Sequence, residues 1–146
     1  MTIDALTEGA GRHDLASVTI TVVREFDVSH ARILATEMAG RIGFSASRVC
    51  RIATAVSELG SNLVLHTTSG GQLSLIPLFA GGRHGLEVLA TDNGPGIPDL
   101  ALAMTDGVTT NGGLGCGLPG SRRLMDEFEI ASTAGEGTRV AARLWR

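Results

Sequence analysis

The order in which helical and strand-like patterns follow one another constrains the fold of this chain most. The predicted order is a strand, two helices, two strands, a loop-rich insertion, a helix and two final strands. The predicted strands occupy residues 18–26, 72–79, 85–91, 129–133 and 138–145. Because helices do not alternate with strands one for one, the order favours a layered α+β sandwich over a doubly wound parallel sheet.

Two consecutive helices are predicted between the first two strands. Ser29 is placed to cap a helix that Gly43 would end, and Ser45 or Ser47 could cap the next one. In the second helix, apolar residues recur at spacings of three and four and form one stripe that faces a core. The stripe comprises Val49, Ile52, Val56, Leu59 and Leu63. A third helix is expected over residues 118–128.

Size and composition indicate one globular domain. The chain has 146 residues, of which 43% are hydrophobic, and a net charge of −3. We expect a mobile tail at residues 1–15 and a single domain over residues 16–146. The acidic balance argues against nucleic acid as a partner. No apolar run is long enough to span a membrane, and the first residues do not resemble a signal peptide. We therefore expect no membrane partner and predict a cytoplasmic location.

The most informative count is the absence of lysine, since all 12 basic residues are arginine. A P-loop and a eukaryotic-type protein kinase each need a lysine at the phosphates, so both are excluded, as is Schiff-base chemistry. Cys50 and Cys116 have no zinc-ligand spacing and are interpreted as ordinary buried thiols. The four histidines likewise lack metal-ligand spacing.

Glu58 and Asn62 lie off the apolar stripe of the second helix. Because they are four residues apart, they share one flank and can point into one cleft. An amide oxygen can bind Mg²⁺, and a carboxylate can take a proton from an attacking hydroxyl. A solvated helix flank is the alternative. Gly60 between them costs helix stability, which suggests a close backbone approach at that position.

Two glycine-rich segments follow. In "DNGPGI" the carboxylate of Asp92 stands at a strand end, where it could accept a hydrogen bond from an amine, although a plain β-turn is the alternative. "GLGCG", at residues 113–117, precedes a helix, so backbone amides and the helix dipole could bind a phosphate chain there. A mobile loop is equally compatible with this composition. "GEGT", at residues 135–138, predicts a hairpin turn.

Taken in order, these motifs resemble the GHKL, or Bergerat-fold, ATP-binding superfamily. The series is E-x-x-x-N on a helix, D-x-G-x-G after a strand, G-x-G-x-G before a helix and a closing Gly-Thr. "GLGCGLPGSRRLMDEFEIASTAGEGTRV" and "AVSELGSN" are similar to RsbT-like switch-protein serine/threonine kinases. The resemblance implies a two-layer sandwich with a mixed sheet and helices on one face.

The resemblance also implies roles for single residues. Glu58 would be the general base or water-positioning carboxylate, and Asn62 would bind Mg²⁺. Asp92 would hold the adenine amino group of ATP, supported by the hydroxyl of Thr138. The remaining positions would give the ring room or offer backbone amides to the phosphates: Gly94, Gly96, Gly113, Leu114, Gly115 and Gly117.

The function implied is phosphoryl transfer from Mg-ATP to a Ser or Thr of a STAS-domain protein in bacterial stress signalling. Release from that protein would let the kinase activate a PP2C-type phosphatase. The alternative is an RsbW-type anti-sigma factor, which sequesters a sigma factor and phosphorylates an anti-anti-sigma factor. A nucleotide-gated module that activates a phosphatase without catalysis is a third hypothesis, disfavoured by the presence of both Glu58 and Asn62.

Overall fold

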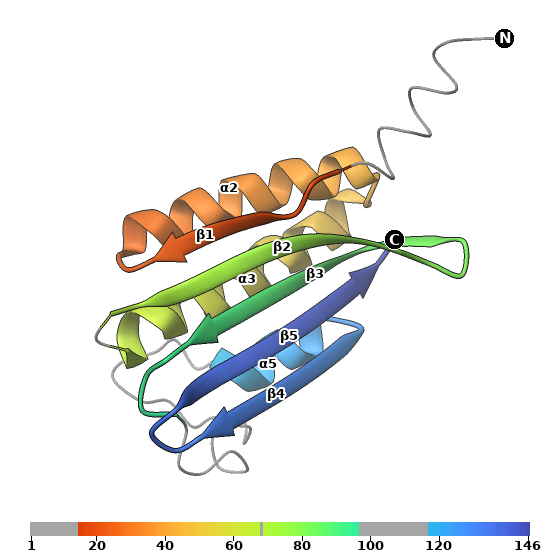
Figure 1. Cartoon of the computed structure of the whole chain (residues 1–146). Helices are drawn as coiled ribbons and strands as arrows, with labels where there is room; N and C mark the ends of the chain where they lie inside the picture. The colour runs from red at the N-terminus through yellow and green to blue at the C-terminus, as the bar shows by residue number, and fades with distance from the viewer. Residues whose placement is uncertain (1–14, 68, 97–116) are drawn as a thin grey trace, which may run out of the picture.

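A computed structural model describes residues 15–67, 69–96 and 117–146 of the chain. These residues form one five-stranded sheet with three helices on one of its faces (Figure 1). The elements, in chain order, are β1 (Val18–Val22), α2 (Glu25–Ile42), α3 (Ala46–His66), β2 (Gly71–Ala80), β3 (Arg83–Asp92), α5 (Gly117–Leu124), β4 (Glu127–Thr133) and β5 (Gly137–Trp145). The predicted α+β sandwich is confirmed.

The strand order is β1-β2-β3-β5-β4, and all four pairings are antiparallel. The expectation of a mixed sheet is therefore wrong for the described strands. Two helices separate β1 from β2, so the chain re-enters the sheet antiparallel to β1. The connection from β3 through α5 does bring β4 back parallel in direction to β3, but β5 inserts between them and pairs antiparallel with both.

The boundary between the first strand and the first helix lies earlier in the sequence than predicted. β1 ends at Val22, and α2 begins at Glu25, whereas the sequence suggested a strand to residue 26 and a helix capped by Ser29. The carboxylate of Asp27 accepts hydrogen bonds from the backbone N–H groups of Val23 and Arg24, both at 3.0 Å. This carboxylate satisfies two free donors and fixes the helix start earlier than Ser29. Gly43 ends the helix, as predicted.

Helix α3 matches its prediction closely, except that Cys50 is exposed where a buried thiol was expected. Of the two candidate caps, Ser45 is the one used, since its hydroxyl accepts a hydrogen bond from the backbone N–H of Arg48. Four residues of the predicted stripe are buried, and Val49 packs against the core: the buried four are Ile52, Val56, Leu59 and Leu63. The stripe faces the apolar side of the sheet, contributed by Leu73, Leu75, Leu86, Val88 and Leu144.

The last helix is shorter than its sequence pattern indicates. α5 ends at Leu124, although a helix to residue 128 was expected, and β4 already begins at Glu127. Glu127 pairs with Arg143 and Phe128 with Ala142 across β4 and β5. Long-range strand pairing therefore overrides the local helical periodicity in this segment.

Two further expectations, the mobile tail and the lack of a membrane span, can be compared only with the residues that the structure describes. Of the predicted tail, the structure describes only Leu15, which packs against the core. Within the described ranges, no helix combines the length and apolar character needed to cross a membrane.

Candidate nucleotide-binding site

The candidate site begins where the C-terminal turn of α3 meets the loop that follows β3. The hydroxyl of Thr67 donates a hydrogen bond to the carbonyl oxygen of Leu63 at 2.6 Å, which fixes the side chain at the helix end. A Cβ atom at Gly94 would lie 3.2 Å from Cγ2 of Thr67. The loop can approach the helix this closely because residue 94 has no side chain. Asn62, the predicted metal ligand, lies five residues before Thr67 toward the same end of α3.

Asp92 is the last residue of β3, as its position after an apolar run predicted. Its Oδ1 atom accepts a hydrogen bond from the backbone N–H of Gly94 at 2.8 Å, which forms a local turn and fixes the carboxylate. Its other oxygen has no hydrogen-bond partner among the described residues. A fixed carboxylate with one available oxygen is suited to accept a hydrogen bond from a ligand amine.

The loop at residues 93–96 rests on the turn between β4 and β5. The backbone N–H of Gly135 donates a hydrogen bond to the carbonyl oxygen of Pro95 at 2.8 Å. Gly96 has a φ of 76°, and a Cβ atom there would come within 2.5 Å of the carbonyl oxygen of Thr133. Only glycine satisfies both constraints. Two of the four sequence motifs, which lie far apart in the chain, are thus in direct contact.

Thr138 lies beside Asp92 in the register of β3 and β5. Its hydroxyl forms a 2.9 Å hydrogen bond with the hydroxyl of Ser132 on β4, directly across the pair of strands. Sequence reasoning found Thr138 but missed Ser132. Once a hairpin around residues 134–136 is assumed, pairing Thr138 with Ser132 follows from the strand register, so the signal was present.

Glu58 and Asn62 lie on α3, both half-buried. Neither side chain makes a hydrogen bond or an ion pair with another part of the chain that the structure describes. Because both side chains are only partly buried, water or a ligand can reach them. Both groups are therefore available to a ligand.

Gly60, by contrast, has a structural explanation. A Cβ atom at this position would lie 3.0 Å from Cγ1 of Val28 on α2. The close backbone approach that the glycine suggested is therefore the packing of α2 against α3. It lends no support to a ligand site at Glu58 and Asn62, which stand on their own geometry.

The predicted phosphate-binding segment is described only at its end. Gly117 is the first residue of α5, where free backbone N–H groups favour an anion. Gly113, Leu114 and Gly115 lie outside the described residues. α5 packs against α3, so its first turn and the flank of Asn62 belong to neighbouring helices (Figure 1).

A magnesium ion at Asn62 would need ligands from elsewhere. Within the described ranges, no group of three or more His, Cys, Asp and Glu side chains is placed to hold a metal ion. Mg²⁺ commonly binds through one or two side chains, substrate phosphates and water, so a single amide oxygen beside a phosphate chain fits its chemistry.

Comparisons with known proteins identify the family of the chain. The model of the histidine kinase-like ATPase domain matches residues 23–144. The serine/threonine-protein kinase RsbT of Bacillus subtilis (strain 168) is 44% identical over 126 residues, which cover 86% of this chain and 94% of RsbT. The anti-sigma F factor of Thermoanaerobacter sp. (strain X514) is 32% identical over 117 residues, or 77% of this chain and 80% of that factor.

Solved structures support the fold. The RsbU and RsbW domains of a Mycobacterium tuberculosis protein superimpose with a TM-score of 0.63 at 20% identity, covering 90% of this chain and 33% of that one. The chain thus spans about a third of that structure. The mycobacterial sensor histidine kinase MprB gives a TM-score of 0.54 at 16% identity, covering 89% of this chain and 96% of that one. The chain therefore belongs to the histidine kinase-like ATPase domain family, as one of its RsbT-like serine/threonine-protein kinases.

Proposed function

We propose that this kinase transfers the γ-phosphoryl group of Mg-ATP to a serine or threonine hydroxyl of a STAS-domain partner protein. The observation that carries the proposal is the contact of the loop after Asp92 with the β4–β5 turn and with the end of α3, the helix that carries Glu58 and Asn62. The 44% identity with RsbT over most of both chains supports the same function.

The adenine ring would bind at Asp92. The available carboxylate oxygen would accept a hydrogen bond from the exocyclic amine, which guanine does not present at that position. Thr138 would support the ring through its hydroxyl, held by Ser132. Gly94 and Gly96 would give the ring room. Both glycines are also required by the fold, since a Cβ atom at either would meet atoms of Thr67 or Thr133.

Phosphoryl transfer would take place along the flank of α3. Asn62 would hold Mg²⁺, which when bound neutralises phosphate charge. Glu58 would accept the proton of the attacking Ser or Thr hydroxyl. The oxygen of that hydroxyl would form a bond to the γ-phosphorus, and the bond from the γ-phosphorus to the bridging oxygen would break, which releases ADP. Backbone amides of Gly113, Leu114, Gly115 and Gly117 would bind the phosphates, which is how a chain without lysine could manage this chemistry.

The partners follow from the same similarity. We propose that the kinase, once released from its phosphorylated STAS-domain substrate, binds and activates a PP2C-type phosphatase in the cytoplasm. An RsbW-type role, in which the chain sequesters a sigma factor, is the second candidate. It is favoured by the 32% identity with an anti-sigma F factor over 77% of this chain.

The test is to incubate the purified protein with Mg-ATP and the STAS-domain protein encoded nearest to it, and to weigh that protein by intact-mass spectrometry. One added phosphate, absent with the Glu58→Gln variant, is the expected result. ATP binding without transfer, together with a stable complex with a sigma factor, would contradict the proposal and favour the second candidate.

A further inference from the structure

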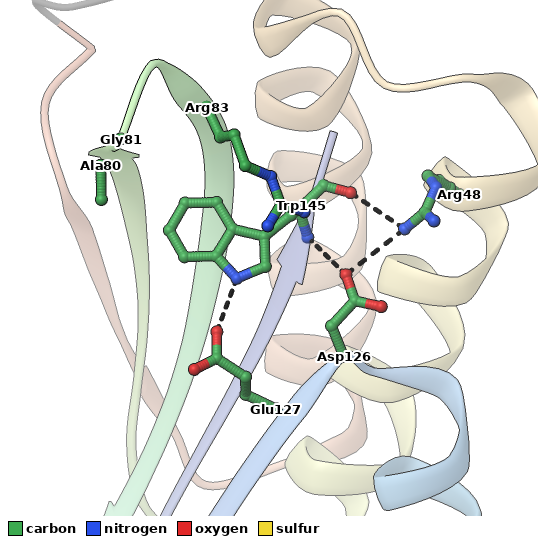
Figure 2. A pocket seen from close by; sticks show the side chains of 7 residues that line it. All are labelled: Arg48, Ala80, Gly81, Arg83, Asp126, Glu127 and Trp145. Carbon is green, nitrogen blue, oxygen red and sulfur yellow. Dashed lines mark hydrogen bonds and ion pairs between the residues drawn. The ribbon is translucent and has the colours of Figure 1, made fainter.

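A hollow of about 690 Å³ lies at the end of the sheet opposite the candidate nucleotide site. It lies between the β2–β3 turn, the start of α3, the start of β4 and the end of β5 (Figure 2). The residues that line it are Arg48, Ala80, Gly81, Arg83, Asp126, Glu127 and Trp145. β3 starts at this hollow and ends at Asp92. At 3.3 Å per residue the two ends are about 30 Å apart, so the hollow is separate from the nucleotide site.

The centre of the hollow is Trp145, whose orientation is fixed from several sides. Its backbone N–H donates to Oδ2 of Asp126 at 2.9 Å, and its carbonyl oxygen accepts from Nη1 of Arg48 at 2.9 Å. Its indole Nε1–H donates to a carboxylate oxygen of Glu127 (Figure 2). The ring packs directly on the β3 backbone, because a Cβ atom at Gly85 would lie 2.7 Å from its Cε3 atom.

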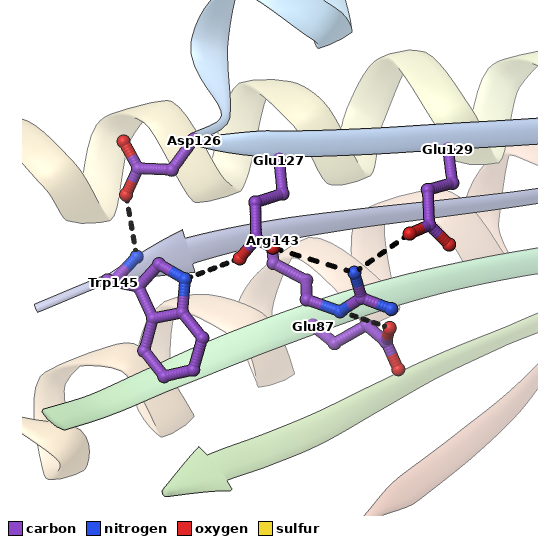
Figure 3. Close-up of polar contacts among 6 residues, drawn as sticks. All are labelled: Glu87, Asp126, Glu127, Glu129, Arg143 and Trp145. Atoms are coloured by element: carbon purple, nitrogen blue, oxygen red, sulfur yellow. Dashed lines mark hydrogen bonds and ion pairs between the residues drawn. The ribbon is translucent and has the colours of Figure 1, made fainter. Parts of the chain in front are cut away.

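The charged groups around the indole differ in how far they are neutralised. Arg48 lies 3.5 Å from the carboxylate of Asp126. Glu127 binds the indole and lies 3.9 Å from Arg143 (Figure 3). The guanidinium carbon of Arg83 lies 5.1 Å from the centroid of the Trp145 ring, and no carboxylate among the described residues forms an ion pair with it. The charge left without a counter-ion is therefore the Arg83 guanidinium, held against an aromatic ring.

We propose that this hollow docks a segment of a partner protein that carries an Asp or Glu side chain next to an apolar one. The carboxylate would pair with Arg83, and the apolar group would pack on the exposed part of the indole. Tryptophan and arginine at the centre of a patch are the residues that most often dominate protein–protein binding energy. A preorganised indole also costs little conformational entropy on binding.

A single negative charge fits the hollow better than a phosphate does. The residues that line it include two arginines and two acids, Arg48, Arg83, Asp126 and Glu127, so their charges cancel. A carboxylate adds one negative charge opposite Arg83. A phosphate group would add nearly two and would meet the carboxylates of Asp126 and Glu127 without a second unpaired cation.

Such a docking site would leave the nucleotide end of the sheet accessible. A partner held at Trp145 would not cover Asp92, which lies about 30 Å away along β3. The chain could then hold one protein at this end while it binds nucleotide at the other. This inference rests on the geometry of the hollow and does not depend on the proposed phosphoryl transfer.

The composition of the chain supplies a direct probe. Trp145 is the only tryptophan, and the chain has no tyrosine, so intrinsic fluorescence excited at the indole reports on the hollow alone. We would select phage-displayed random dodecapeptides on the full-length protein, synthesise the enriched sequences and titrate them while following Trp145 emission. The expected sequences contain Asp or Glu beside an apolar residue and change the emission saturably.

The variants are Arg83→Gln, Arg83→Lys and, as a matched control, Arg32→Gln on the exposed side of α2. Losing one charge-assisted hydrogen bond should weaken peptide binding about tenfold in Arg83→Gln. Arg83→Lys should lie between that variant and the wild type, because lysine keeps the charge but not the planar stacking. Arg32→Gln should bind as the wild type does, and circular dichroism would confirm that all three variants fold.

Three outcomes would overturn the proposal. One is that selection yields no peptide that changes Trp145 emission. Another is that the enriched peptides lack an acidic residue, or bind Arg83→Gln as tightly as the wild type. The third is that a phosphoserine version of an enriched peptide binds more tightly than its glutamate version, which would assign the hollow to a phosphorylated partner instead.

Discussion

The two ends of the β3–β5 strand pair are built in opposite ways. At one end Asp92 faces Thr138 across the register, and at the other Gly85 faces Trp145. At the first end the Asp92 carboxylate accepts one hydrogen bond from the described residues, from the backbone N–H of Gly94, and its other oxygen has no partner among them. At the second end the backbone N–H, the carbonyl oxygen and the indole N–H of Trp145 all have partners within the chain.

Between these ends, Arg143 forms ion pairs with three carboxylates on the sheet face away from the helices. It lies 2.8 Å from Glu87, 3.5 Å from Glu129 and 3.9 Å from Glu127 (Figure 3). Burial acts to lower the pKa of Arg143, but the charges of Glu87, Glu129 and Glu127 outweigh it and leave the pKa raised. The difference teaches that polar groups with internal partners stabilise the sheet, whereas polar groups without them are available for ligands.

The largest expected effect is on phosphoryl transfer at the nucleotide end of the sheet. Glu58→Gln should lower phosphoryl transfer by about a hundredfold or more, because a general base contributes at least that much. ATP affinity should stay near the wild-type value, since the amide occupies the same space. Single-turnover transfer at saturating ATP, with ATP binding measured by calorimetry, separates the two quantities. Loss of affinity equal to the loss of rate would contradict the catalytic role.

Next in size is the effect of Asp92→Asn on binding. The asparagine oxygen can still accept the N–H of Gly94, so the turn should persist, but a charge-assisted hydrogen bond to adenine would be lost. ATP affinity should fall about tenfold to a hundredfold in calorimetry. An unchanged affinity, with the fold intact by circular dichroism, would remove Asp92 from the adenine site.

At the structural interior of the sheet, the expected effect is on stability. Glu87 is only 8% exposed and forms the shortest ion pair of Arg143. Glu87→Gln should lower the free energy of unfolding by about 1–2 kcal/mol, measured in urea, and leave ATP affinity unchanged. Glu129→Gln is the matched control. Its side chain is 64% exposed, so its loss should cost less than about 0.5 kcal/mol. Equal costs would show that burial is not what distinguishes the two pairs.

The smallest effect concerns pH and the start of α2. Hydrogen bonds from the backbone N–H groups of Val23 and Arg24 lower the pKa of Asp27 below its ordinary value of 3.8. A lowered folded-state pKa adds stability above the unfolded-state pKa, and that stability is lost as the pH falls through the folded-state value. Unfolding free energy measured below pH 4 should therefore fall less steeply in Asp27→Asn than in the wild type. Glu25→Gln, which removes a nearby charge, should keep the wild-type slope.

Sequence reasoning succeeded where local pattern decides the structure. The stripe of α3 and the strands β2, β3 and β5 follow from periodicity, and the order of elements predicted the two layers. The motif residues Asp92, Gly94 and Thr138 also lie together, as expected. Sequence reasoning placed the start of α2 too late because the cap comes from Asp27, inside the first turn, rather than from a serine before it.

Contacts between residues far apart in sequence could not be predicted. Arg48 and Trp145 are 97 positions apart, and no local signal connects them. No local pattern in the sequence indicated the hollow around Trp145, because the residues that line it come from distant parts of the chain. The insertion of β5 between β3 and β4, which makes the sheet antiparallel, likewise depends on long-range pairing.

One titration tests the central claim most directly, because it observes both ends of the strand pair at once. ¹⁵N-labelled protein would be titrated with Mg-ATP while the backbone amide resonances of Gly94 and Thr138 and the single indole resonance of Trp145 are followed by NMR. We predict that Gly94 and Thr138 shift and that the indole resonance stays in place. A shift of the Trp145 indole with Gly94 and Thr138 unchanged would place the nucleotide at the wrong end of the sheet and contradict the account.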